Sequence, residues 1–116
     1  MDNGKIFLNT SKREYKKYKE TARLLVENRI SHYNKLYNFK INRIAIKNTK
    51  SRWGSCSKIG YLNFNYKIAL LPEALADYVI VHELCHLGEF NHSKRFWKLV
   101  SLAIPNYKKL KNQFQT

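Results

Sequence analysis

The chain has 116 residues, of which 44% are hydrophobic and 14% aromatic, and its 22 Lys and Arg against 8 Asp and Glu give a net charge of +14. This length and apolar content fit one domain with its own core and exclude wholesale disorder. No apolar run reaches the roughly 18 residues of a membrane helix, no secretory signal is visible, and two cysteines, Cys56 and Cys85, are too few for a disulfide framework. We expect a cytoplasmic monomer.

Residues 1–10 show no hydrophobic period and are expected to form an arm before a single domain at 11–116. A long helix is predicted from Ser11, an N-cap with Glu14 in the capping-box position, to about Tyr37. Its apolar residues recur every three or four positions, so one face should pack on the core.

The hydrophobic period then shortens to two. Residues 41–48 and 60–68 alternate as strands do, and the segment 51–60 between them, with two glycines and three serines, predicts a turn or hairpin. We therefore expect a small, mostly antiparallel, twisted sheet.

Helices are predicted to follow the sheet. One begins with Pro72 at its first position, is apolar almost all round and should be the buried central helix, with Gly88 as its C-cap. Another starts near Asn91 or Ser93 and ends before Pro105, and a short basic helix closes the chain. The predicted fold class is α+β.

The central helix carries the motif H-E-x-x-H. His82 and His86, four residues apart, lie on one helical face and can bind one metal ion, while Glu83 can reach a metal-bound water without being a ligand. A catalytic zinc usually has three protein ligands and an open position. The sequence therefore predicts one Zn²⁺ per chain, with Glu83 as the general base.

Two residues compete for the third ligand position. His92 lies six residues beyond His86, past Gly88, where the chain can turn back, and it is the preferred ligand. Glu89 is the alternative, but three residues from His86 it would need an awkward turn. The remaining histidine, His32, falls in the first helix and is expected at its surface.

Four sequence blocks in this order, "SRWGSC", "DYVIVHELCHL", "NHSKRFW" and "PNYK", resemble the YgjP-like metallopeptidases, which are related to the SprT-like zincins. In size the chain also resembles the minigluzincins, minimal zincin domains made as latent proenzymes. The resemblance implies a zincin-like fold in which the active-site helix precedes a second helix bearing the third ligand. It also implies that His82, His86 and His92 are metal ligands and that Glu83 is the general base.

Further residues are candidates for the substrate cleft. Asn63, Phe64 and Asn65 lie on the strand expected to border it, and an edge strand there could hold an extended peptide by main-chain pairing. Three tyrosines are possible oxyanion donors among which the sequence does not choose: Tyr66, Tyr78 and Tyr107.

The arm contains three consecutive apolar residues at 6–8, which would gain by burial in a groove beside the cleft. Asp2 or Asn3 could then approach the zinc and make the enzyme latent, although the resemblance allows either terminus to block the cleft. The alternative is a disordered leader.

The sequence as a whole predicts a small zinc metallopeptidase acting on peptides or proteins. Two alternatives stay open. The charge of +14 would suit a nucleic-acid-binding module with a structural zinc, and a zincin-fold binding protein without activity would also keep the metal.

Overall fold

The computed structural model describes residues 9–114 and has the expected α+β composition. The first element, α1, is a helix of 26 residues, Lys12–Tyr37. Its start is confirmed, because the Ser11 hydroxyl accepts a hydrogen bond from the Glu14 N–H at 3.0 Å. Its end lies at Asn38, which adopts a left-handed conformation with φ of 58°.

The sheet has three strands, β1 (Arg43–Lys47), β2 (Gly54–Cys56) and β3 (Tyr61–Asn65), in the order β1-β3-β2. β1 pairs with β3 in parallel and β2 pairs with β3 antiparallel, so the sheet is mixed rather than mostly antiparallel. The segment between β1 and β3 is long enough for a parallel crossover, and β2 forms inside the stretch expected to be only a turn.

The alternating segment predicted as one strand to residue 68 changes structure at Asn65. A 3-10 helix, η1 (Tyr66–Leu70), begins there, and the Asn65 side chain caps it by accepting from the Lys67 N–H at 2.9 Å. The last residues of the predicted strand, 66–68, therefore belong to η1 instead.

The central helix, α2 (Glu73–Cys85), begins one residue later than expected, because Pro72 is its N-cap and not its first helical residue. It ends at His86, which keeps right-handed geometry, so Gly88 is not its C-cap. Gly88 meets a spatial need instead, because a Cβ there would lie 2.7 Å from the ring of Phe39. The remaining helices are α3 (Lys94–Ala103), capped by Ser93, and α4 (Tyr107–Lys111).

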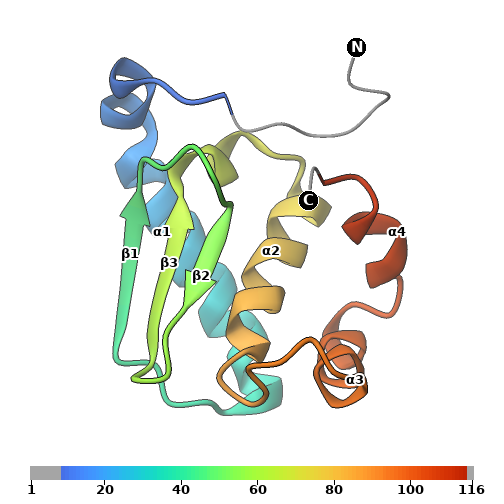
Figure 1. Ribbon diagram of the computed structural model, residues 1–116. Helices are drawn as coiled ribbons and strands as arrows, with labels where there is room; N and C mark the ends of the chain where they lie inside the picture. Colours follow the sequence, from blue (N-terminus) through green and yellow to red (C-terminus); the bar gives the residue numbers. More distant parts are fainter. Residues whose placement is uncertain (1–8, 115–116) are drawn as a thin grey trace.

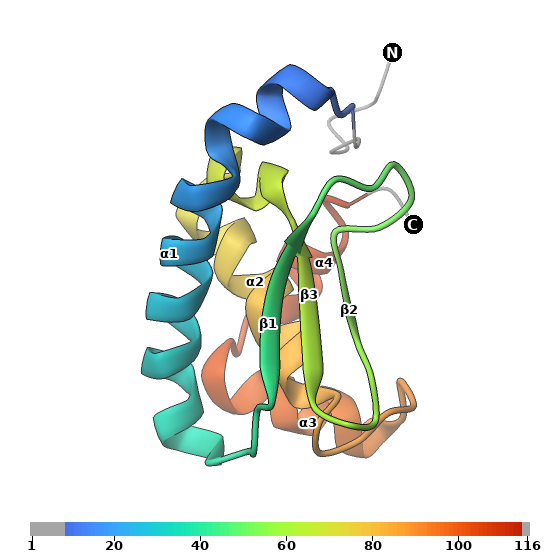
Figure 2. The same cartoon turned by 90° about the vertical axis from the view of Figure 1, so that its left-hand side faces the viewer.

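Helices α1 and α2 cover one face of the sheet, and α3 and α4 pack on the far side of α2 (Figures 1 and 2). Helix α2 is thus enclosed by the sheet and by all three other helices. Its buried residues meet Leu62 and Phe64 of β3 in one core. Within residues 9–114 no helix is both long enough and apolar enough to cross a bilayer.

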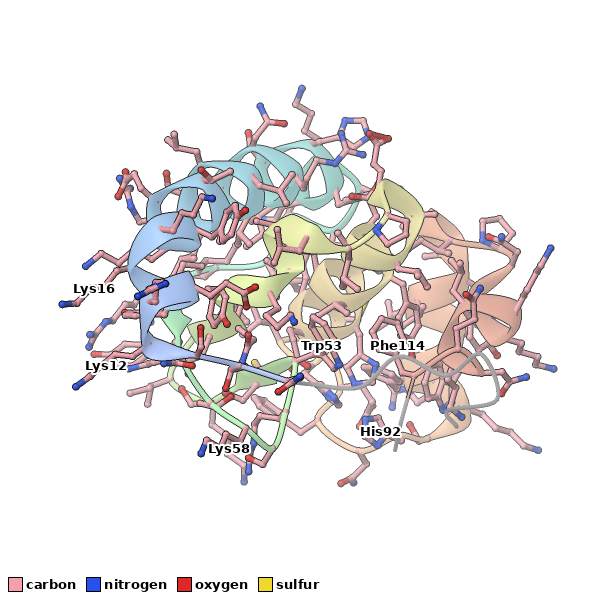
Figure 3. All side chains as sticks on the ribbon, turned by 90° about the horizontal axis from the view of Figure 1, so that it is seen from above. Lys12, Lys16, Trp53, Lys58, His92 and Phe114 are labelled. Carbon is pink, nitrogen blue, oxygen red and sulfur yellow. The ribbon has the colours of Figure 1, made fainter. Side chains whose placement is uncertain are left out.

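Basic residues cover much of the surface. Seen from above, Lys12 and Lys16 of α1 and Lys58 of the β2–β3 turn lie toward one edge, away from Trp53, His92 and Phe114 (Figure 3). The first group therefore marks a part of the positive surface that is remote from the histidines.

One partly buried ion pair fastens α1 to α2. The Arg29 guanidinium donates to both carboxylate oxygens of Asp77, at 2.9 and 2.8 Å, and the Tyr33 hydroxyl donates to the same carboxylate at 2.8 Å. Asp77 is 7% exposed, so water has little access to its carboxylate and would replace these partners poorly.

We expect Asp77→Ala to lower the free energy of unfolding by about 2 to 3 kcal/mol, because it leaves the Arg29 charge without its partner. Urea denaturation measures the loss. Glu20→Ala, which breaks an exposed pair with Arg23 on α1, is the matched control and should change stability by less than about 0.5 kcal/mol. Equal losses in the two variants would contradict this account of the pair.

Candidate metal centre and cavity

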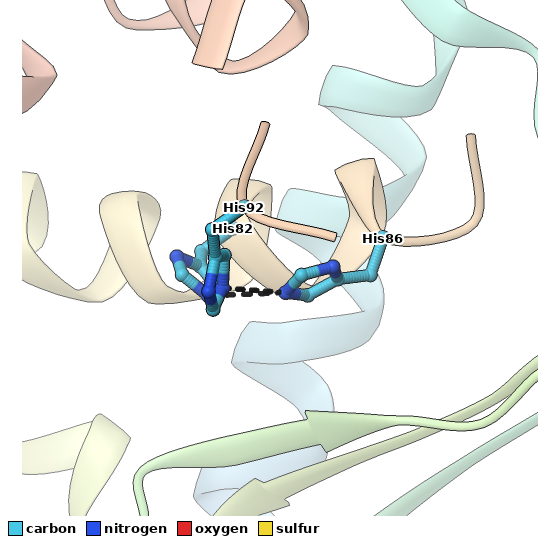
Figure 4. Close-up of side chains that lie close together, drawn as sticks. All are labelled: His82, His86 and His92. Carbon is cyan, nitrogen blue, oxygen red and sulfur yellow. Dashed lines mark hydrogen bonds between the residues drawn. The ribbon is translucent and has the colours of Figure 1, made fainter. Parts of the chain in front are cut away.

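Three histidines converge at the end of α2. The Nε2 atom of His86 lies 3.3 Å from that of His82 and 3.0 Å from that of His92, and the third side of the triangle is 3.2 Å (Figure 4). Of the described residues, these three form the group of His, Cys, Asp or Glu side chains able to share one metal ion.

Local structure explains the convergence. His82 and His86 are one helical turn apart at the end of α2. The chain then reverses, and the His86 Nδ1 atom lies 3.1 Å from the carbonyl oxygen of Glu89. His92 directly precedes Ser93, the N-cap of α3, so it lies in the connecting loop and not on the second helix as expected.

The geometry fits a tetrahedral zinc site. Zinc–nitrogen bonds of about 2.0–2.1 Å place the ligand nitrogens of a tetrahedron about 3.3 Å apart, close to the observed triangle. A carbonyl oxygen can only accept, so the His86 Nδ1 atom carries the proton and leaves a lone pair on Nε2 for a metal. Three imidazole nitrogens facing one another cannot all be satisfied by mutual hydrogen bonds, whereas a shared cation satisfies them together.

The lowered pKa values of two histidines also favour metal binding at this site. Burial lowers the pKa of His82 to about 3, with smaller contributions from the charges of His86, His92 and Lys111. Burial also lowers the pKa of His86. Neutral imidazole is the form that binds metals, so these two side chains are ready for ligation at neutral pH.

The rival third ligand points elsewhere. The carboxylate of Glu89 lies 3.7 Å from the guanidinium of Arg95, and Glu89 does not belong to the group of converging ligands. His32 lies on α1, with its ring against Tyr33. The structure thus brings together the three histidines preferred from the sequence.

Glu83 is 8% exposed and lies beside the histidines on α2. Burial raises the pKa of its carboxyl group to about 8, and the charge of Arg52 opposes that rise. Strand β2 crosses directly over this side chain, because a Cβ on Gly54 would lie 2.8 Å from the Glu83 Cγ atom. Only glycine lets the strand approach so closely.

These residues face a cavity of about 800 Å³, a size suited to a ligand site. One wall is the segment 50–54, the floor is α2 with His82 and Glu83, and the opposite side is formed by His92, Trp97 and the C-terminal residues Lys111 and Phe114. The sequence did not single out Gly54, Lys111 or Phe114. Residues 51–54 of the first wall belong to the block "SRWGSC", which carries part of the family resemblance.

The three tyrosines considered as oxyanion donors lie in different places. Tyr78 lines the cavity, with its hydroxyl 3.3 Å from the His82 Nδ1 atom. Tyr66 is fully buried elsewhere, where its hydroxyl accepts from the Ser11 N–H and donates to Glu14, so it cannot be the donor. Tyr107 stacks behind Trp97 and does not line the cavity.

The expected substrate strand requires a correction. Asn63, Phe64 and Asn65 belong to β3, which is the central strand and is paired on both sides, so it offers no free edge to a peptide. Phe64 is a core residue, and the Asn65 side chain bonds the carbonyl oxygen of Thr49. The edge beside the cavity is β2.

The hydrogen-bond pattern of β2 leaves that edge open. Asn65 donates to the Trp53 carbonyl and Ser57 donates to the Tyr61 carbonyl, so the odd-numbered residues that flank β2 bond β3. The backbone groups of Gly54 and Cys56 consequently point away from the sheet.

Comparisons with known proteins identify relatives of this chain. A family model described as "YgjP-like, metallopeptidase domain" matches residues 8–116. The zymogen of the Pyrococcus abyssi metallopeptidase abylysin is 25% identical and superposes with a TM-score of 0.68, over 75% of this chain and 89% of that one. The zymogen of Methanocaldococcus jannaschii jannalysin is 26% identical with a TM-score of 0.60, over 78% of this chain and 90% of that one.

A mutant of Wss1 from Saccharomyces cerevisiae is 18% identical and has a TM-score of 0.63, over 81% of this chain and 83% of that one. At that identity the likeness shows the fold alone. A sequence search of curated proteins found no match. The solved structures confirm the zincin-like α+β fold expected from the four sequence blocks.

We expect His92→Ala to weaken zinc retention sharply, because the substitution removes one of the three nitrogens that would surround the ion. Metal analysis after dialysis against a weak chelator measures the loss. Glu89→Ala is the control and should retain zinc like the unaltered protein. The reverse result, zinc retained without His92 and lost without Glu89, would refute this ligand set.

Proposed function

The chain belongs to the YgjP-like family of metallopeptidase domains, and from this premise we propose a zinc-dependent peptidase of the HExxH type with Glu83 as its general base. The observation that carries the proposal is the shared cavity. The buried carboxylate of Glu83 lines the same cavity of about 800 Å³ as His82 and His92, and the His86 Nε2 atom lies within 3.3 Å of the Nε2 atoms of both histidines.

The histidines would hold one zinc ion through their Nε2 atoms. Such an ion supplies Lewis acidity, which polarises a carbonyl group and makes a water molecule acidic near neutral pH. Tyr78 and the Glu89 carbonyl, next to the Nδ1 atoms of His82 and His86, would fix the orientation of the two rings.

Glu83 would take a proton from the attacking water and pass it to the leaving amine. Its burial keeps competing solvent from the carboxylate, and the raised pKa makes the group a stronger base than an exposed glutamate. Nearby positive charge from Arg52 and from a bound cation favours the ionised form that accepts the proton.

The free edge of β2 would align the substrate. An extended peptide can pair with the outward backbone groups of Gly54 and Cys56, which places its main chain beside Glu83. This assigns to β2 the role that the sequence suggested for the neighbouring strand.

We expect Glu83→Gln to keep zinc and fold while peptidase activity falls by roughly 10²-fold or more, because an amide cannot accept the proton from water. Hydrolysis of an unstructured protein, with metal content measured in the same samples, gives the result. A zinc-loaded variant with undiminished activity would remove Glu83 from the general-base role.

We also propose that the protein is made in a latent form. The two archaeal relatives were crystallised as zymogens. Residues 1–8 of the N-terminal arm at 1–10, which include Asp2 and Asn3, lie outside the described residues. At the other end, Phe114 lines the cavity, with its ring 5.6 Å from that of Trp53 and 5.8 Å from that of Tyr78.

The two termini make separable predictions. If the arm blocks the cleft, a chain starting at Ser11 should hydrolyse an unstructured protein faster than the full chain, with zinc content unchanged. If the C-terminal end blocks it, Phe114→Ala should give the increase instead. Equal rates in all three proteins would contradict latency from either end.

A further inference from the structure

The cavity is one-sided in its charge. Among the described residues that line it, Lys50, Arg52 and Lys111 are basic and Glu83 is the one acid. Glu83 is buried, so the cations form the exposed charge that a ligand meets.

Lys111 is held at the cavity by an aromatic ring. Its Nζ atom lies 4.6 Å from the centre of the Trp97 ring, a cation–π contact. The Trp97 ring in turn stacks on His92, with centroids 5.7 Å apart and planes inclined by 25°. The ammonium group is therefore positioned one ring away from a candidate metal ligand.

Arg52 supplies positive charge on the opposite wall. It lies in the segment leading into β2 and lines both the main cavity and a neighbouring hollow of about 240 Å³, which also includes Lys47 and no acidic residue among its described lining. The basic lining thus continues past the free edge of β2.

These three cations form no ion pair within the described residues. The acids of the described chain that form ion pairs do so elsewhere, with Arg23, Arg29, Lys67 and Arg95. No ion pair in residues 9–114 involves Lys50, Arg52 or Lys111. These three cations are therefore free to attract an anionic group that enters the cavity.

We propose that the cavity selects peptide segments with aspartate or glutamate close to the scissile bond, with Lys111 and Arg52 as the residues that determine this specificity. The inference rests on the proposed peptidase function and adds the substrate class. An acidic side chain gains attraction from both walls, whereas lysine or arginine in the same place is repelled.

The test compares short quenched peptides that differ only by aspartate or glutamate against asparagine or glutamine at one position near the cleavage site. With the zinc-loaded full chain in low salt, kcat/KM should be roughly 3-fold or more higher for the acidic member, the range of one or two exposed ion pairs. Near 1 M salt, where the screening length is about 3 Å, the preference should shrink.

Charge reversal locates the effect. Lys111→Glu should abolish or invert the preference, and Arg52→Gln should reduce it. Lys16→Glu makes the same change in net charge on the remote edge of α1 and should leave the preference intact (Figure 3). Equal kcat/KM values for the two peptides, a preference that survives Lys111→Glu, or the same shift in Lys16→Glu would each overturn the proposal.

A failure of the peptidase function itself gives a different result. If the zinc-loaded full chain, the chain starting at Ser11 and Phe114→Ala all cleave neither peptide, that function fails. Binding of the same peptides to zinc-loaded Glu83→Gln then tests the charge preference without catalysis, by fluorescence anisotropy. Tighter binding of the acidic member, lost in Lys111→Glu, supports the preference, and equal binding refutes it.

Discussion

The contact between Gly54 and Glu83 sets the spacing on which the site depends. The backbone of β2 lies directly on the glutamate side chain, and even one added carbon would come within 2.8 Å of it. Because of this approach, the carboxylate is buried and the open edge of the strand lies beside it. A wider separation would admit water to Glu83 and move the strand away from the histidines.

Helix α2 tolerates its polar residues because each has a specific environment. Asp77 meets the guanidinium of Arg29, and the Nε2 atoms of His82 and His86 face each other and that of His92. Burial on every side makes the helix a rigid support, and it also accounts for the shifted pKa values of His82 and Glu83. The same packing that makes these groups costly to bury thus shifts their pKa values.

Local sequence signals predicted most of the fold. The N-cap at Ser11, the long first helix and the central helix follow from capping residues and periodicity, and the spacing of the motif placed His82 and His86 on one face. Strand order was not predictable in the same way. β2 has three residues and begins with glycine, so it shows no alternation, and β3 was mistaken for an edge strand.

The same limit explains the wrong or missing site residues. Tyr66 was considered at the cleft, but η1 turns it toward Ser11 and Glu14. Lys111 and Phe114 reach the cavity only because α4 packs on α2, a long-range contact without a local signal.

Strand β2 is short enough that its outward backbone groups come from two residues, Gly54 and Cys56. A substrate that pairs there must have free backbone N–H and C=O groups. A segment within a helix or sheet already uses these groups in its own hydrogen bonds. Unfolded or frayed stretches of a protein would therefore be cleaved first.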